Sequence, residues 1–135
     1  MILKLLNKEF YINLSIILFI FIIDRLSKLY VIYYSQKNLN LELYTSTYLN
    51  IILIWNDGIA FGLLSSKDNF FYNLITCLIL VVILILIFLI SKSKGFKRFS
   101  YIMVIGGAFG NLFDRIMYKS VPDFIDVHFN GFHWF

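Results

Sequence analysis

The sequence has little of what a disulfide-braced or loop-rich secreted protein needs. Its 135 residues include one cysteine and one proline. A lone cysteine cannot form an intrachain disulfide, and Cys77 lies inside an apolar run, where a packing role is usual. Charged residues are also scarce, at 15% of the chain, compared with about 25% in an average soluble protein. This low charge, with 60% hydrophobic residues, indicates a single-domain membrane protein comprising residues 1–135.

The net charge of +4 does not indicate a nucleic-acid-binding protein, because most basic residues lie beside apolar stretches. Lys4 and Lys8 precede the first stretch, and "KSKGFKR" (92–98) joins the second to the third. Basic residues beside membrane spans usually stay in the cytoplasm. We therefore predict a cytoplasmic N-terminus, with the segment 35–69 and the tail after Met117 facing outward.

Three apolar stretches are long enough to cross a bilayer, which takes about twenty helical residues. They cover about 10–34, 70–90 and 99–117. No small-residue cleavage site follows the first stretch, so we predict an uncleaved helix and not a signal peptide. In the third stretch, Gly106 and Gly110 have GxxxG spacing, which suits either close helix packing or a functional role.

The outward segment 39–64 has the pattern of strands. "LNLELY" alternates apolar and polar residues, "YLNIILIW" is rich in strand formers, and "NDG" (56–58) is a turn signal. Pro122 disfavours a helix in the tail, which can add another extended piece. The predicted fold is thus an all-α transmembrane helical bundle with a small extracytoplasmic β-sheet.

Ionisable residues in so apolar a chain are the first candidates for function, because charge at membrane depth costs several kcal/mol. Polar residues gather in four short segments: "DRLSK" (24–28), "NDGIAFG" (56–62), "GNLFDR" (110–115) and "VPDFID" (121–126). The expected topology brings Asp24, Asp114 and Asp123 to the outer face. A structural alternative is that Asp24, Asp114 and the arginines that follow them only form ion pairs.

In this order and with this layout of spans, the four segments resemble those of the lipoprotein signal peptidases, also called signal peptidase II. The resemblance covers essentially the whole chain. It implies a four-helix bacterial membrane aspartyl peptidase, which removes signal peptides from diacylglyceryl-modified prolipoproteins by cutting before the lipidated cysteine. It further implies a multi-pass protein of the cytoplasmic (inner) membrane with its active site at the outer face. Its partners would be prolipoprotein substrates and membrane lipids, with no nucleic acid, cofactor or metal.

The resemblance also assigns roles to residues. Asp123 matches one of the family's two catalytic aspartates. Residues of the other three segments match positions that bind the substrate or shape the site in the family. They are Asp24, Lys28, Asn56, Gly58, Asn111, Asp114 and Arg115. The second catalytic aspartate belongs to an FNxAD motif that, with a fourth helix, would lie beyond Phe135, where this sequence stops. We therefore expect three spans without the fourth, half of a carboxylate pair that must share one proton, and little activity from these 135 residues alone.

Other catalytic and metal-binding interpretations are weaker. Asp126, His128 and His133 have poor spacing and too few ligands for a metal site, so no metal is predicted. Asp126 is expected to be an exposed surface carboxylate that does not replace the second catalytic aspartate. Ser27 and Lys28 point about 100° apart on a helix, so they do not form a Ser–Lys dyad.

Two non-catalytic functions stay open. One is a relative that binds lipoprotein precursors without cutting them. The other is a transporter subunit that relays protons through Asp24 and Asp114. A relay needs acidic residues at successive depths, whereas here they gather at one depth, which favours a peptidase site.

Overall fold

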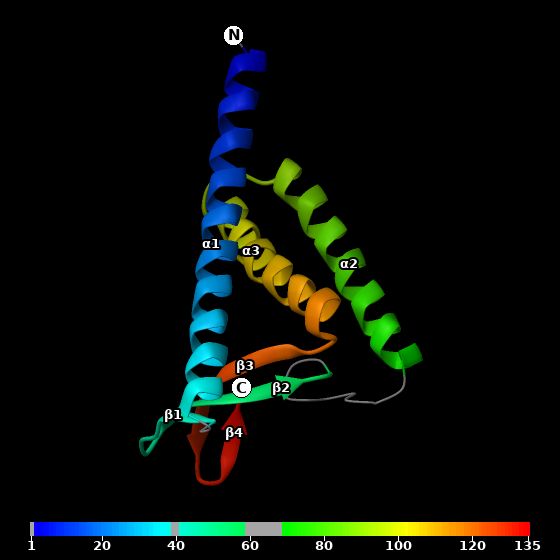
Figure 1. The fold of residues 1–135 in the computed structure, drawn as a ribbon. Coiled ribbons are helices and arrows are strands. Elements are labelled where there is room, and N and C mark those ends of the chain that lie inside the picture. Colours follow the sequence, from blue (N-terminus) through cyan, green and yellow to red (C-terminus); the bar gives the residue numbers. More distant parts are fainter. Residues whose placement is uncertain (1, 39–40, 59–68) are drawn as a thin grey trace.

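Three long helices and a small sheet make up the described part of the chain. The computed structural model describes residues 2–38, 41–58 and 69–135. The helices are α1 (Ile2–Asn38), α2 (Asn69–Lys92) and α3 (Gly95–Tyr118). All four strands lie at one end of the helices, beyond the C-terminal end of α1 and close to where α2 begins (Figure 1). The predicted combination of a mostly helical fold with a small sheet is confirmed, and the structure shows that the sheet is antiparallel.

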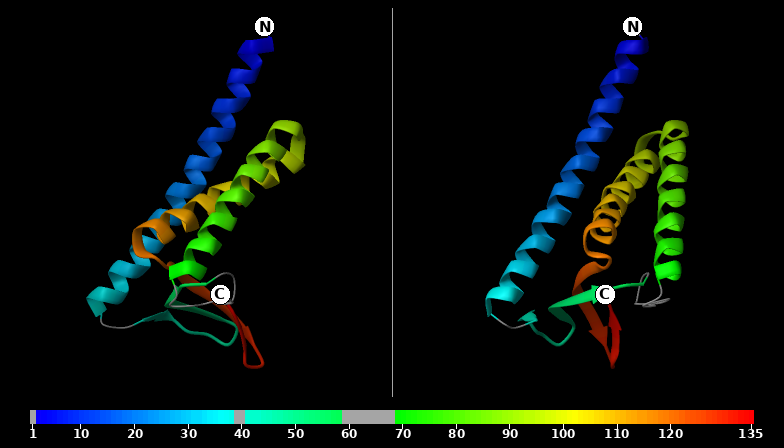
Figure 2. Two further views of the ribbon diagram at one scale, coloured as in Figure 1. Left: turned by 90° about the vertical axis from the view of Figure 1, so that its right-hand side faces the viewer. Right: turned by 45° about the vertical axis from the view of Figure 1, so that its right-hand side comes forward.

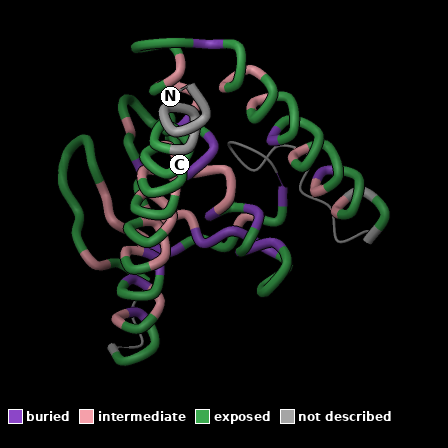
Figure 3. Tube along the Cα trace, turned by 90° about the horizontal axis from the view of Figure 1, so that it is seen from above, coloured by how far each residue is buried: buried purple, intermediate pink, exposed green. Residues whose placement is uncertain are grey.

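Many residues along the helices are exposed (Figure 3), and a large share of these exposed residues are apolar. In the part of the chain that the structure describes, Tyr72–Lys92 in α2 is the one helix segment long and apolar enough to cross a membrane. Its outward surface is built almost entirely of leucine, isoleucine, valine and phenylalanine. The other two predicted spans, about 10–34 and 99–117, lie within α1 and α3 and stay predictions.

The two glycines of the GxxxG pattern lie where α3 packs against α1. A methyl group at Gly106 would stand 2.7 Å from the Cβ of Ile20, and one at Gly110 would overlap the carboxylate of Asp24. No side chain larger than hydrogen fits between the two helices at these positions. The structure therefore gives both glycines a packing role, and Gly110 brings α1 close to α3 beside a charged residue.

The sheet is antiparallel with strand order β1-β2-β3-β4. Its strands are β1 (Glu42–Tyr44), β2 (Leu49–Asn56), β3 (Val121–Phe129) and β4 (Phe132–Trp134). α3 is followed by its C-cap residue Lys119, whose left-handed backbone turns the chain toward β3. β2 and β3 pair along most of their length, as the views in Figure 2 also show. This pairing places the two regions that were expected to be extended, the segment 39–64 and the tail after Met117, side by side. Residues 39–40 and 59–64 of that segment lie outside the described residues.

Candidate active site

Four charged side chains from α1 and α3 form one ion-pair cluster. Arg25 lies between two carboxylates, with its Nη2 2.7 Å from an oxygen of Asp24 and 2.7 Å from an oxygen of Asp114. Its Nη1 donates to the other oxygen of Asp114. Lys28 Nζ, one turn further along α1, is 3.0 Å from Asp24 and 2.7 Å from Asp114. Two cations thus balance two carboxylates.

Burial explains why the cluster is fully paired. Asp114 is completely buried and Lys28 is 5% exposed. A buried carboxylate is tolerated when opposite charges and hydrogen bonds replace its water. Lys28 Nζ also donates to Asn111 Oδ1 at 2.8 Å, so the cluster includes both residues that GNLFDR places three apart on α3. For Asp24, Arg25 and Asp114, this is the ion-pair arrangement considered as the structural alternative.

Arg115 points elsewhere and links α3 to the end of β2. Its Nη2 donates to the carbonyl oxygen of Gly58 at 2.7 Å, and the side chain is buried. The backbone carbonyl of Arg115 accepts a hydrogen bond from the Tyr72 hydroxyl of α2. Arg115 is therefore a junction between α3, α2 and the segment that follows β2, and it takes no part in the charge cluster around Asp114.

Asp123 lies on β3 opposite the end of β2. Asn56 Nδ2 donates to Asp123 Oδ2 at 2.8 Å, and Asn56 Oδ1 accepts the backbone N–H of Gly58 at 2.8 Å. Asp123 is half-buried, so one side of its carboxylate is held by Asn56 while part of the residue remains accessible. This is a suitable setting for a carboxylate that must exchange a proton with water.

Gly58 connects Asp123 to the helices. Its N–H donates to Asn56 and its carbonyl oxygen accepts from Arg115. The structure thus places all eight predicted site residues in one charge cluster and one hydrogen-bonded chain that meet on α3: Asp24, Lys28, Asn56, Gly58, Asn111, Asp114, Arg115 and Asp123. The part of NDGIAFG after Gly58 lies outside the described residues.

Arg25 and Tyr72 were not predicted as site residues. Arg25 makes the most extensive contacts with Asp114, and its position directly after Asp24 was the available signal. Tyr72 had no such signal, because its partner is a backbone carbonyl 43 residues away. A contact of that kind depends on how α2 and α3 pack, which the local sequence does not encode.

The prediction of an exposed Asp126 is wrong. Asp126 is completely buried, with Asn50 Nδ2 at 3.1 Å and His133 Nδ1 at 2.8 Å from one of its oxygens. β4 folds back beside β3 and covers this carboxylate, a pairing that the sequence pattern did not reveal. Asp123 and Asp126 are three residues apart on a strand and have different partners, as side-chain alternation requires.

Phe135 marks the point beyond which the second catalytic aspartate is expected. It directly follows β4, and its ring stacks on that of His133, with ring centroids 6.4 Å apart. β4 pairs with β3, the strand that carries Asp123. Phe135 therefore lies beside the same small sheet as Asp123. The position of the second aspartate beyond Phe135 stays a prediction.

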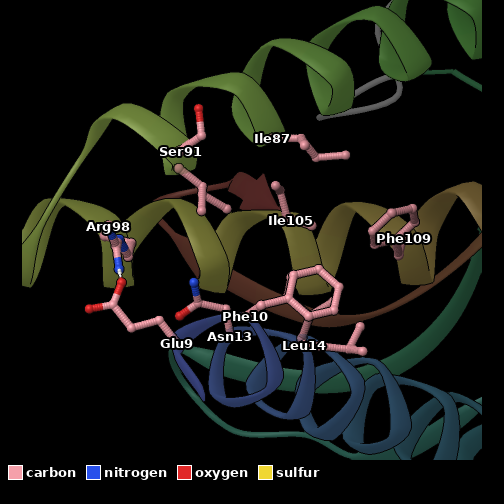
Figure 4. A pocket seen from close by; sticks show the side chains of 11 residues that line it. Glu9, Phe10, Asn13, Leu14, Ile87, Ser91, Arg98, Ile105 and Phe109 are labelled. Carbon is pink, nitrogen blue, oxygen red and sulfur yellow. Dashed lines mark hydrogen bonds and ion pairs between the residues drawn. The ribbon is translucent and has the colours of Figure 1, made fainter. Parts of the chain in front are cut away.

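An apolar cavity of about 550 Å³ lies between the helices, away from the sheet. Phe10 and Leu14 of α1, Ile87 of α2 and Ile105 and Phe109 of α3 face into it (Figure 4). An ion pair between Glu9 and Arg98, with 2.6 Å between the charged atoms, closes its edge. The cavity lining is mainly hydrocarbon, so it suits an apolar chain and not peptide hydrolysis.

Comparison of the sequence with known proteins identifies the family to which this chain belongs. Residues 16–135 match the family model described as signal peptidase (SPase) II. The chain belongs to the signal peptidase II family. It is accordingly a peptide hydrolase, and signal peptidase II proteins act in lipoprotein processing by removing signal peptides from prolipoproteins.

Relatives across the signal peptidase II family support this assignment. The lipoprotein signal peptidase of Pelagibacter ubique is 49% identical over 128 residues, which cover 95% of this chain and 77% of the relative. That of Anaplasma marginale is 40% identical over 87% of this chain and 68% of the relative. For the Blochmanniella pennsylvanica protein, at 44% identity, the match covers 64% of this chain and 54% of the relative.

A solved structure of a membrane enzyme has a fold similar to that of this chain. It is described as a bacterial membrane enzyme determined by the in meso method. It is 26% identical in sequence and superposes with a TM-score of 0.70, covering 90% of this chain and 73% of the other. This chain is therefore a membrane protein with the helix-and-sheet arrangement of that enzyme.

Proposed function

We propose that this protein cleaves diacylglyceryl-modified prolipoproteins just before the lipidated cysteine, with Asp123 as one of two catalytic aspartates. We place it in the bacterial cytoplasmic (inner) membrane as a multi-pass protein, with a cytoplasmic N-terminus and the sheet at the outer face. Supporting this orientation, Lys92 and Arg98 lie at the end of the helices remote from the sheet, as basic residues on the cytoplasmic side should.

The hydrogen bond between Asn56 and Asp123 carries the proposal. It holds a carboxylate at the junction of sheet and helices, where a lipid-tethered peptide and water can meet. In an aspartyl mechanism, one ionised carboxylate takes a proton from the attacking water while its protonated partner polarises the scissile carbonyl. The partner then donates its proton to the leaving amine, which completes hydrolysis.

The partner carboxylate is neither Asp114 nor Asp126. Both oxygens of Asp114 are engaged by Arg25 and Lys28, and Asp126 is engaged by Asn50 and His133. We propose that the partner is the aspartate of an FNxAD motif, as the resemblance to the family implies. We therefore assign Asp114 a structural role in holding α1 against α3, next to the substrate site.

The remaining site residues position the substrate or the loop that contacts it. Arg115 fixes Gly58, just after β2, against α3, and we assign this pair to the binding of the peptide backbone. Lys28 of α1 and Asn111 of α3 are hydrogen-bonded to each other within the charge cluster between the two helices. The exposed apolar helix surfaces leave room for lipid chains and for the apolar signal helix in the bilayer.

A cleavage assay tests the proposal and separates it from the precursor-binding alternative. The 135-residue chain and a form extended beyond Phe135 through FNxAD and the helix after it are compared on a lipid-modified prolipoprotein in detergent. We expect cleavage before the lipidated cysteine by the extended form and precursor binding by both. Equal rates for the two forms would refute the two-carboxylate assignment. Binding without cleavage by the extended form would favour a precursor-binding relative.

A proton relay is not favoured by the structure. Arg25 and Lys28 bridge Asp24 and Asp114, so the two carboxylates of that hypothesis lie in one cluster and at one depth. Neither is placed to pass a proton toward the opposite side of the membrane.

A further inference from the structure

The β3–β4 hairpin brings together three side chains that can ligate a metal. Asp126 and His128 are two residues apart on β3 and share a face of the strand, and His133 on β4 pairs directly with His128. One potential ligand atom from each residue lies within 4.8 Å of both others. The cluster is separate from Asp123 and from the ion pairs of α1 and α3.

The hairpin turn explains why the sequence spacing did not reveal this group. Asn130 and Gly131 both have positive φ, 48° and 82°, the pair of conformations that closes a two-residue hairpin. The turn places His133 opposite His128, so the third ligand comes from the neighbouring strand. Metal-ligand patterns in sequences are usually recognised from spacing along one element, which this arrangement lacks.

The separations fit a shared cation. His133 Nδ1 lies 2.8 Å and His128 Nδ1 3.6 Å from the same oxygen of Asp126. Around a tetrahedral zinc ion, with nitrogen and oxygen ligands at about 2.0–2.2 Å, neighbouring ligand atoms stand roughly 3.4 Å apart. Small side-chain adjustments therefore bring both histidine nitrogens and the carboxylate to one ion. The two imidazole rings are stacked, with centroids 5.1 Å apart.

The hydrogen bond between His133 and Asp126 does not by itself explain why His128 is also placed in this cluster. It satisfies His133, but His128 Nδ1 is buried and has no hydrogen-bond partner among the described residues. Buried polar atoms are normally paired, and a metal ion would give this nitrogen a partner. Asn50 Nδ2 donates to Asp126 at 3.1 Å, the kind of outer contact that orients a ligating carboxylate.

We propose that Asp126, His128 and His133 form a binding site for a divalent transition-metal cation, with Zn²⁺ as the expected ion. Two imidazoles and a carboxylate are ligands that zinc accepts, and the half-exposed His133 leaves a fourth position open to water. The ion would tie β4 to β3, and through Asn50 to β2. Its role is structural, and it takes no part in peptide hydrolysis, so the proposal stands independently of the catalytic assignment.

Zinc titration of the full chain tests the site directly. The protein is purified without a histidine tag, stripped with a chelator and titrated with Zn²⁺ against a chromophoric competitor. We expect one zinc per chain, with binding weakened at least about tenfold in His128→Gln, since a ligand is removed. Glu42→Gln, which removes a carboxylate from the same sheet, should bind zinc like the wild type. Equal affinity in the wild type and His128→Gln would overturn the proposal.

Two further measurements keep the test independent of folding. His128→Gln is first compared with the wild type without metal, because loss of the stacking of its ring on His133 can itself change the unfolding temperature. It should lose the rise in Tm that Zn²⁺ gives the wild type. X-ray absorption of the zinc-loaded wild type needs no variant. Two imidazole ligands would support the site, and a spectrum without imidazole would refute it.

Discussion

Asn56 and Asp123 lie 67 residues apart in the sequence and are joined by a hydrogen bond of 2.8 Å. Because Asn56 Oδ1 accepts the N–H of Gly58, its Nδ2 must face Asp123. The amide thus holds the carboxylate in one orientation at the end of β2. Asn56 is a positioning residue for the proposed catalytic aspartate.

Replacing Asn56 with aspartate tests this relationship. Asn56→Asp places a carboxylate oxygen where the amide donated, so the two carboxylates repel each other and Asp123 loses its donor. A hydrogen bond to a charged group contributes about 1.5–3 kcal/mol, so we expect kcat to fall roughly tenfold to a hundredfold. The measurement is kcat and KM for lipid-modified precursor across pH. Asn130→Asp, at an exposed position of the β3–β4 turn, is the control and should retain activity. Unchanged kcat and pH profile in Asn56→Asp would show that Asn56 does not position Asp123.

Alanine substitutions in α3 test the close contact between α1 and α3. Gly106→Ala sets a methyl group 2.7 Å from Ile20 Cβ, and Gly110→Ala sets one against the Asp24 carboxylate. We expect each to destabilise the fold by about 1–3 kcal/mol, measured as a lower unfolding temperature in detergent. Gly107→Ala is the matched control, because nothing lies within 4 Å of its added methyl group. It should be stabilised by roughly 0.5–1 kcal/mol, as expected inside a helix. The same response from all three would contradict the packing role.

Removal of the Lys28 charge tests the balance of the buried cluster. Lys28→Met leaves Asp24 and Asp114 with Arg25 as their single cation in the cluster, and breaking a buried pair costs about 3–5 kcal/mol. Adding Asp114→Asn restores the balance and should recover part of the lost stability. Thermal unfolding of both single variants and the double variant measures the coupling. Additive losses would show that the pair is not coupled. Lys97→Met, at an exposed position of α3, serves as the control.

Arg115→Lys tests the junction between α3 and the segment after β2. Lysine keeps the charge but has no guanidinium group to reach Gly58 O as Arg115 Nη2 does at 2.7 Å. We expect a higher KM for the precursor, because Gly58 is no longer anchored to α3. A binding isotherm with labelled precursor would show the loss directly. Wild-type binding by Arg115→Lys would remove Arg115 from the proposed substrate site.

Much of the fold followed from simple patterns. Long apolar stretches indicated helices. Within 39–64, alternation in LNLELY and the strand formers of YLNIILIW indicated strands. GNLFDR at a helix end correctly grouped Asn111 and Asp114, because residues three apart share a helix face. The proximity of the four polar segments followed from topology and from the family resemblance together, since periodicity says nothing about contacts between distant segments.

The missed features depend on strand register and on helix packing. The burial of Asp126 arises because β4 returns along β3 and brings His133 to it, and register is set by tertiary contacts and turn geometry. The packing role of Gly110 likewise depends on Asp24 facing it from α1. From the GxxxG spacing alone, a packing role and a functional role for Gly106 and Gly110 were equally compatible with the sequence.

Cleavage by Asp123→Asn in the form extended through FNxAD is the most direct test of the central claim. Asparagine keeps the shape of the side chain but cannot take a proton from water, so the account predicts loss of cleavage with precursor binding retained. Glu42→Gln, on the same sheet but away from the site, should cleave at the wild-type rate. Cleavage by Asp123→Asn at the wild-type rate would remove Asp123 from the mechanism and contradict the account.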